Sequence, residues 1–355
     1  MKFSSVFLVV LFVLNSVAFT QVPKTRLSEM SAEQAGFNTD SLKKLEHYLE
    51  SSGSSALLLV YDGQVFFDWG KTDQKHVIHS IRKALLSSLY GIFVEKGVID
   101  TSATLADLGI DDIEPSLTPR EKQATVADLL KSRSGVYHNA AAVSRGMLAG
   151  KPERGSFKPN EHFYYNNWDF NTLGYILEMK TGESIYDLFY EEIALPLGML
   201  HYQGRFAELD GEDEKAKLPD TDGVYQYEKS KSKYPAYHFR MSAHDLAKYG
   251  VLYLNDGRWN GKQIVPKSWV EASTTSYSLT NKYVNIGYGM LWSVLIPNEQ
   301  RKTKSFYHTG AGVHMLGVYP GSKLVMVHRV DTEGENEFEQ ERLYEIISLI
   351  FASQN

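Results

Sequence analysis

The pattern that most constrains the fold is the return of strand-like sequence at the end of a chain whose middle is helical. Residues 56–61 and 64–69 are β-rich runs on either side of Asp62-Gly63, which is a strong hairpin signal. Residues 98–235 have a mainly helical and loop-rich pattern. The β-rich pattern then returns in three runs, at 288–295, 312–319 and 324–331. Early and late strands can complete one antiparallel sheet if the middle of the chain is an insertion.

Helical periodicity frames these strands. A helix-rich segment covers 26–55, a helix is predicted over 80–96, and another closes the chain at about 337–352. The sequence therefore predicts an α+β fold, in which an antiparallel sheet is flanked by N- and C-terminal helices and carries an inserted, mainly helical subdomain. The predicted division is a signal peptide at 1–20, an α/β sheet domain at 21–97 and 240–355, and the helical insertion at 98–239.

The first twenty residues have the organisation of a secretory signal peptide. Lys2 precedes an apolar run at 6–14, and small residues suit cleavage after Ala18, with Thr20 as the alternative. The run is short for a bilayer span, and no later stretch reaches about 18 apolar residues. We expect an exported protein, periplasmic or secreted, with no transmembrane segment in the mature chain. An uncleaved anchor is the alternative.

Composition excludes several functional classes. The formal net charge is −6, so no overall basic field favours a nucleic-acid partner. The 355 residues include no cysteine, which excludes disulfides and thiolate chemistry. Eleven histidines are present, but no H-E-x-x-H or comparable metal spacing occurs. We expect neither a metal site nor a cofactor.

The first reactive motif is Ser80-Ile81-Arg82-Lys83, at the start of the predicted helix over 80–96. A serine hydroxyl is a weak nucleophile and needs a base. Residues three apart on a helix lie on the same side, so Lys83 can reach the Ser80 hydroxyl. The alternative is a helix-capping serine beside a solvated lysine, because S-x-x-K alone is common.

Two further motifs carry groups that suit the same chemistry. Tyr165-Asn166-Asn167 precedes an amphipathic segment, where a phenol can shuttle a proton and an amide can hold a carbonyl. His308-Thr309-Gly310-Ala311 comes just before the predicted strand 312–319, and its small residues let a substrate lie beside the strand edge. The Ala311 N–H can serve as an oxyanion donor. Each motif alone also fits a structural role.

The order of the motifs S-x-x-K, Y-x-N and H-x-G resembles the beta-lactamase-related serine hydrolase family. That family includes class C beta-lactamases, D-alanyl-D-alanine peptidases, family VIII esterases and 6-aminohexanoate-dimer hydrolases. The surrounding segments are similar as well: 80–97, 125–135 (TVADLLKSRSG), 163–182 and 241–261. The resemblance covers roughly residues 30–350. It implies a beta-lactamase/transpeptidase-like fold.

The resemblance also implies roles for individual residues. Ser80 is then the nucleophile, Lys83 and Tyr165 are the base and acid pair, and Asn167 positions the substrate and the lysine. The N–H groups of Ser80 and Ala311 form the oxyanion hole, and His308 and Gly310 border the substrate. The sequence leaves open whether Lys83 or Tyr165 takes the first proton, because their titrations are coupled.

The third motif departs from the pattern of beta-lactamases and D-alanyl-D-alanine peptidases, which usually have lysine where this chain has His308. A neutral imidazole recognises a carboxylate less well than an ammonium does. We therefore expect a serine esterase or amidase that acts on a small ester, amide or peptide-like substrate. A D-amino-acid peptidase or beta-lactamase is the first alternative, and a catalytically silent binding or sensing module is the second. The sequence does not specify an oligomeric state.

Overall fold

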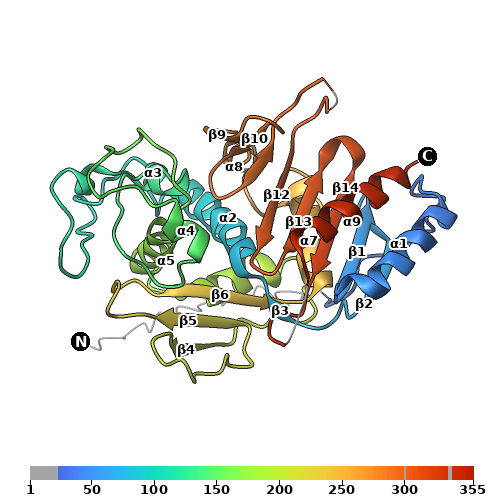
Figure 1. Ribbon diagram of the computed structural model, residues 1–355, viewed down its shortest axis with the longest axis horizontal. Coiled ribbons are helices and arrows are strands. Elements are labelled where there is room, and N and C mark those ends of the chain that lie inside the picture. The colour runs from blue at the N-terminus through green and yellow to red at the C-terminus, as the bar shows by residue number, and fades with distance from the viewer. Residues whose placement is uncertain (1–22, 300, 335–337) are drawn as a thin grey trace, which may run out of the picture.

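The computed structural model describes residues 23–299, 301–334 and 338–355, and Figure 1 shows the course of the chain. The predicted signal peptide at 1–20 lies outside the described residues, so its cleavage and the export of the protein stay predictions. In the described part, no helix combines the length and the apolar character needed to cross a membrane.

An eight-stranded antiparallel sheet joins the two ends of the chain, with strand order β2-β1-β14-β13-β12-β11-β10-β9. The strands are β1 (Ala56–Tyr61), β2 (Gln64–Gly70), β9 (Ser278–Asn281), β10 (Ile286–Tyr288), β11 (Ser293–Leu295), β12 (Ser305–Gly310), β13 (His314–Tyr319) and β14 (Leu324–Arg329). The first strand pairs with the last, with Ala56 opposite Arg329. The predicted α+β class with one sheet built from both ends is confirmed.

Local turn chemistry explains where the strand predictions succeed and fail. Asp62 and Gly63 have φ of 46° and 85°, as a two-residue type I′ hairpin requires, and the first hairpin is confirmed. The single strand predicted at 288–295 is wrong: the chain turns between β10 and β11, where Leu291 has φ of 66°. Strands β9 and β12 were not predicted.

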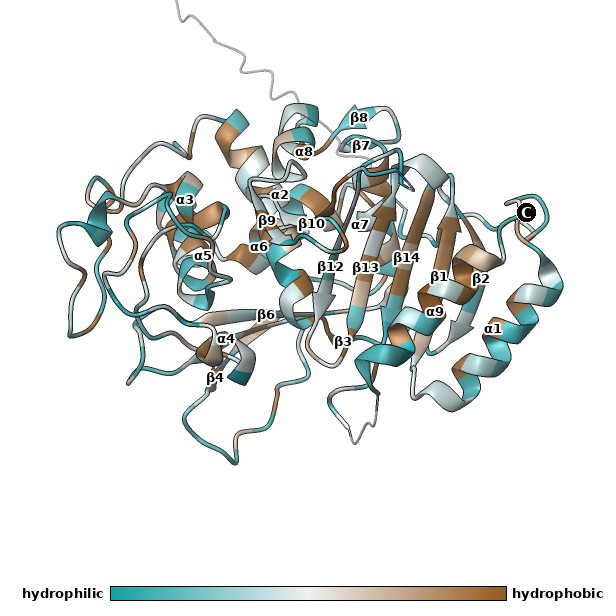
Figure 2. Cartoon of the chain, turned by 45° about the horizontal axis from the view of Figure 1, so that its top comes forward, coloured by the Kyte–Doolittle hydropathy of each residue, from teal (hydrophilic) through white to brown (hydrophobic). Residues whose placement is uncertain are grey.

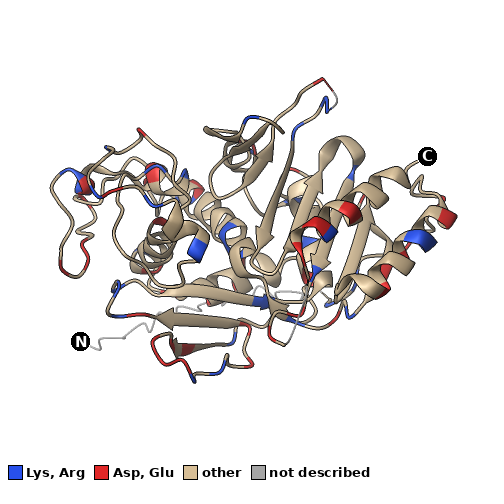
Figure 3. Cartoon of the chain, in the orientation of Figure 1, with Lys and Arg blue, Asp and Glu red and all other residues tan. Residues whose placement is uncertain are grey.

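Helices cover both faces of this sheet. The terminal helices α1 (Thr39–Ser52) and α9 (Gln340–Ala352) pack together on the outer face, while α7 (Ala243–Leu254) packs on β14, β13 and β1 from the inner face. Every residue of β13 and β14 is buried, so these strands are apolar along most of their length instead of alternating (Figure 2). Charged side chains gather instead on α1, α9 and the loops (Figure 3).

Residues 98–239 contain the predicted helices and also strands that the sequence did not predict. A four-stranded sheet has the order β3-β6-β5-β4, formed by β3 (His76–Val77), β4 (Phe206–Asp210), β5 (Gly223–Tyr227) and β6 (Ala236–Met241). The α-helices within 98–239 are α3 (Val126–Leu130), α4 (Arg145–Ala149), α5 (Asn167–Thr181) and α6 (Ile185–Phe189). Outside that range lie α2 (Arg82–Glu95), α8 (Lys267–Ser273), β7 (Arg258–Trp259) and β8 (Lys262–Gln263). The description of the insertion as mainly helical was thus incomplete, and its bounds stay a prediction.

One buried carboxylate ties the insertion to α7. Asp245 accepts hydrogen bonds from the backbone N–H groups of Leu200 (2.7 Å), His201 (2.9 Å) and Tyr202 (3.0 Å). We expect Asp245→Ala to lower the free energy of unfolding by about 3 kcal/mol, because three amides lose a charged acceptor. Urea denaturation measures this. Asp40→Ala is the control, since Asp40 occupies the first turn of α1 but is exposed; equal losses in the two variants would contradict the expectation.

Candidate active site

Ser80 lies where the chain leaves β3 and enters α2. His79 has a left-handed φ of 47°, and a 3-10 turn over His79–Ile81 then leads into the helix. A non-glycine residue in this conformation is uncommon and is often found at functional sites. The His79 Nε2 lies 2.8 Å from the Thr332 Oγ1, and this hydrogen bond holds the turn. The predicted helix over 80–96 is present, with a 3-10 first turn.

Lys83 reaches Ser80 from one helical turn further on. Its Nζ lies 2.8 Å from the Ser80 Oγ, and its side chain is almost fully buried. Within the residues that the structure describes, no carboxylate pairs with it. Burial lowers the pKa of Lys83 well below its usual value, and the positive charge of Arg82 acts in the same direction. An amine in this environment can accept a proton at neutral pH.

Tyr165 covers the lysine from the segment that precedes α5. The Lys83 Nζ lies 4.7 Å from the centroid of the Tyr165 ring and 4.6 Å from that of Phe170. Burial raises the pKa of Tyr165, and hydrogen bonding with Ser80 only partly opposes this. The phenol therefore keeps its proton at neutral pH, while the neighbouring amine loses its proton readily.

Asn167 is the first residue of α5, which the preceding Asn166 caps by accepting the Trp168 N–H at 3.1 Å. The Asn167 Nδ2 donates to the carbonyl of Ala142 at 2.5 Å. No hydrogen bond joins Asn167 to Lys83 in the described part of the chain. The Asn167 Oδ1 is buried without a partner there. It is thus available to accept a hydrogen bond from a ligand.

The third motif precedes the strand β13, as the sequence suggested, and it also forms the end of β12, which the sequence did not predict. His308, Thr309 and Gly310 are the last residues of β12. A Cβ on Gly310 would lie 2.5 Å from the carbonyl oxygen of Ile78, so a larger residue would push the strand away from the turn that carries Ser80. The N–H of the following Ala311 donates no hydrogen bond within the described residues. It can therefore donate to an oxyanion.

His308 presents a neutral acceptor to the same region. Its Nδ1 lies 3.0 Å from the Thr309 carbonyl oxygen, which can only accept, so Nδ1 carries the proton. Its Nε2 is buried with no partner among the described residues. Burial lowers the pKa of His308 to about 3, and the charge of Lys83 acts in the same direction. His308 therefore accepts a hydrogen bond and offers no positive charge to a carboxylate.

These groups converge on one cleft of about 640 Å³ between the sheet, α2 and the insertion. All seven residues singled out from the sequence line it: Ser80, Lys83, Tyr165, Asn167, His308, Gly310 and Ala311. None of the described residues that line the cleft is an aspartate or a glutamate. The arrangement can supply a nucleophile, a base, a proton donor and an amide donor, which is the set of groups that acyl transfer requires.

Two further residues line the cleft without having been assigned a role from the sequence. The Arg82 guanidinium lies 4.1 Å from the centroid of the Tyr237 ring and donates weakly to Asn171 at 3.4 Å. Its Nη1 is buried with no partner in the described part. His238 comes from β6, and burial lowers its pKa well below the usual value. Arg82 was visible inside the first motif, whereas His238 lies on an unpredicted strand.

Comparison with known protein families tests the family resemblance that the three motifs suggested. The family model described as Beta-lactamase matches residues 43–350, which is most of the chain. The chain belongs to the beta-lactamase family. The likeness inferred from the three motifs is thereby confirmed, and the chain has the fold of that family's serine hydrolases and peptidases.

Sequence relatives within the beta-lactamase family are distant. A protein of Escherichia coli (strain K12), provisionally named a D-alanyl-D-alanine carboxypeptidase, is 24% identical over 241 residues, covering 57% of this chain and 55% of the relative. The chain thus spans little more than half the length of that protein. The provisionally named penicillin-binding protein PbpX of Bacillus subtilis (strain 168) is 24% identical over 279 residues, covering 72% of this chain and 68% of the relative.

Solved structures share the fold over nearly the whole chain. A Bacillus anthracis protein, provisionally described as a 6-aminohexanoate-dimer hydrolase, has a TM-score of 0.65 at 18% identity, covering 94% of this chain and 88% of that one. The octameric penicillin-binding protein homologue from Pyrococcus abyssi has a TM-score of 0.63 at 21% identity, covering 88% and 78%. At these identities the likeness establishes the fold alone.

Proposed function

We propose that this chain is a serine hydrolase that cleaves a carboxylic ester or an amide through a covalent acyl-enzyme on Ser80. The observation that carries the proposal is the contact between Lys83 and Ser80. The Lys83 amine is buried, has no carboxylate partner in the described part of the chain, and places its Nζ 2.8 Å from the Ser80 Oγ. A buried lysine without a carboxylate partner is costly to a fold, and such groups are typical of active sites.

The pKa directions support Lys83 over Tyr165 as the group that takes the first proton. Burial lowers the pKa of Lys83 and raises that of Tyr165, so Lys83 is the group that accepts the Ser80 proton. The Ser80 Oγ then bonds to the substrate carbonyl carbon. The carbonyl oxygen becomes an oxyanion, which accepts hydrogen bonds from the N–H groups of Ser80 and Ala311. Collapse expels the alcohol or amine, which takes the proton from the Lys83 ammonium with Tyr165 as the relay. In the second half, a water molecule gives a proton to Lys83 and bonds to the acyl carbon; the bond from that carbon to the Ser80 Oγ then breaks, the Oγ takes the proton back, and the acid is released.

Because His308 is neutral, the site favours an ester or amide substrate over a substrate that the enzyme must hold by a carboxylate group of the substrate. Its free Nε2 accepts a hydrogen bond and cannot form an ion pair. The names of the Escherichia coli and Bacillus subtilis relatives favour the alternative, a D-amino-acid peptidase or penicillin-binding protein.

A substrate panel tests this ranking on the purified protein. We expect p-nitrophenyl butyrate or an acyl p-nitroanilide to exceed a D-alanyl-D-alanine peptide and nitrocefin in kcat/KM by at least about tenfold. Faster turnover of the peptide or of nitrocefin would reverse the ranking. A protein that hydrolyses none of them and forms no covalent adduct would be a binding or sensing module.

Arg82 offers a pH-dependent test of the role of Lys83. Because the charge of Arg82 lowers the pKa of Lys83, Arg82→Gln should raise that pKa and leave less neutral amine at pH 7. We expect the acidic limb of the kcat/KM profile to move to higher pH and turnover at pH 7 to fall roughly tenfold. Arg82→Lys keeps the positive charge, so the acidic limb of its kcat/KM profile should lie at the same pH as in the wild type. An unmoved limb in Arg82→Gln would contradict the assignment.

A further inference from the structure

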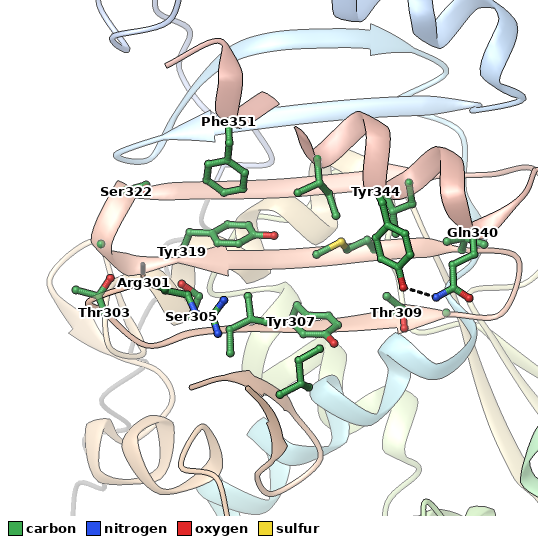
Figure 4. A pocket seen from close by; sticks show the side chains of 18 of the residues that line it. Arg301, Thr303, Ser305, Tyr307, Thr309, Tyr319, Ser322, Gln340, Tyr344 and Phe351 are labelled. Atoms are coloured by element: carbon green, nitrogen blue, oxygen red, sulfur yellow. Dashed lines mark hydrogen bonds between the residues drawn. The ribbon is translucent and has the colours of Figure 1, made fainter. Parts of the chain in front are cut away.

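A second and larger cavity, of about 810 Å³, lies on the outer face of the large sheet, between α9 and β10 to β13 (Figure 4). Successive side chains of a strand point to opposite faces. On β12, His308 therefore faces the catalytic cleft, while Ser305, Tyr307 and Thr309 face this second cavity. We call it the outer groove.

The floor and one wall of the outer groove are aromatic and apolar. Tyr319 lies along β13, where a Cβ on Gly317 would come within 2.7 Å of its ring, so the glycine lets the ring lie flat on the strand. Tyr307 lies beside it on β12, and Phe351 covers Tyr319 from α9 (Figure 4). Tyr344, which is 58% exposed, marks the opposite end of the groove. An apolar chain fits along this surface.

One end of the outer groove is cationic. Arg301 and Lys302 line it, and the described residues that line the groove include no aspartate or glutamate. The Arg301 Nη2 donates to the carbonyl of Ile296 at 2.8 Å, while its Nε is buried with no partner among the described residues. Arg301 lies close enough to act electrostatically on the phenols of both Tyr307 and Tyr319. In the described part, no carboxylate neutralises this guanidinium.

We propose that the outer groove binds an anionic amphiphile, with a carboxylate at Arg301 and Lys302 and an alkyl chain along Tyr319 and Tyr307. A guanidinium without a carboxylate partner is well suited to a carboxylate ligand, because charge-assisted hydrogen bonds to carboxylates are strong. The aromatic floor favours an apolar chain, and the two cationic residues, with no acidic residue among the described lining, favour a negatively charged head group. A cationic or purely apolar ligand satisfies only one of these features.

The outer groove and the catalytic cleft share a wall. Thr309, Gly310 and Ala311 line both cavities, so a ligand in the groove lies against the strand end that carries the Ala311 amide. Because the two cavities adjoin, the experiment must distinguish an amphiphile bound in the outer groove from one bound in the catalytic cleft. The test therefore measures binding directly, separates the two sites by variants, and does not depend on turnover.

Isothermal titration calorimetry of the full chain with dodecanoate, below its micelle concentration, is the experiment. We expect one site with a micromolar Kd, and binding of dodecyltrimethylammonium at least about tenfold weaker because its head has the wrong charge. Ser80→Ala should bind dodecanoate as the wild type does. Failure of the wild type to bind, or equal affinity for the two head groups, would overturn the proposal.

Three variants locate the bound dodecanoate. Arg301→Gln removes the charge, and Ile347→Trp fills the groove while leaving Arg301 in place; each should weaken binding at least about tenfold. Arg82→Gln alters the catalytic cleft only, so it should leave the affinity for dodecanoate unchanged. A loss confined to Arg82→Gln would place the ligand in the cleft. A dimer that Ile347→Trp dissociates, with no dodecanoate binding, would assign the groove to a second copy. Either result overturns the proposal.

Discussion

Replacing Ser80 by alanine is expected to abolish hydrolysis of whichever ester or amide the substrate panel identifies. Loss of the nucleophile of a covalent mechanism lowers kcat by at least about 10⁴-fold, because among the described residues Lys83 is hydrogen-bonded to no hydroxyl other than that of Ser80. The fold should be unaffected, since the Ser80 side chain borders the cleft and contributes little to the core. Steady-state kinetics and a thermal melt on the same preparation measure the two effects.

Ser88→Ala is the matched control for this variant. Ser88 lies on the same helix α2, is fully buried, and donates to the carbonyl of Leu85 at 2.7 Å. Its replacement disturbs the helix without reaching the cleft, so turnover should stay within about twofold of the wild type. Comparable turnover in Ser80→Ala and the wild type would refute the nucleophile assignment, and equal losses in both serine variants would attribute the effect to α2.

Replacing Lys83 by methionine should have opposite effects on activity and stability. Removal of the base is expected to lower kcat by about 10²- to 10⁴-fold. The unfolding free energy should rise, because methionine fills the same space and removes an amine that is buried without an ion pair. Kinetics and urea denaturation of the same samples measure both. Adding Lys83→Met to Ser80→Ala should cause little further loss, since the two groups act as a unit.

Lys248→Met provides the contrast expected of a structural lysine. Lys248 is also buried, but its Nζ donates to the carbonyl oxygens of Leu197, at 3.2 Å, and Gly198. This variant should lose stability and keep its activity, because two carbonyls lose their donor far from the cleft. A Lys83→Met protein that behaves in the same way, less stable but fully active, would mean that Lys83 is structural.

The parts of the site that were predictable from sequence are those fixed by local geometry. Ser80 and Lys83 are one helical turn apart, so their proximity follows from helix periodicity alone. The hairpin at Asp62-Gly63 follows from the turn type that these residues favour. The likeness to the beta-lactamase family supplied the long-range placement of Tyr165 and His308 beside them.

What could not be predicted depends on contacts between distant segments. The β12 sequence SFYHTG contains strand-favouring residues, but six residues alone do not fix the bounds or the partners of a strand, which come from its pairing with β11 and β13 on both sides. The four-stranded sheet of β3 to β6 is likewise assembled from short, separated segments. The lowered pKa of Lys83 results from burial beneath Tyr165 and Phe170, far along the chain. None of these effects has a local signature.

Intact-mass analysis after treatment with a fluorophosphonate probe tests the central claim most directly, since it detects the covalent bond before any substrate is known. One phosphonyl group should attach per chain, peptide mapping should place it on Ser80, and Lys83→Met should slow its attachment while Ser88→Ala does not. A wild-type chain that stays unmodified, or one that carries the group on a residue other than Ser80, would contradict the acyl-enzyme mechanism.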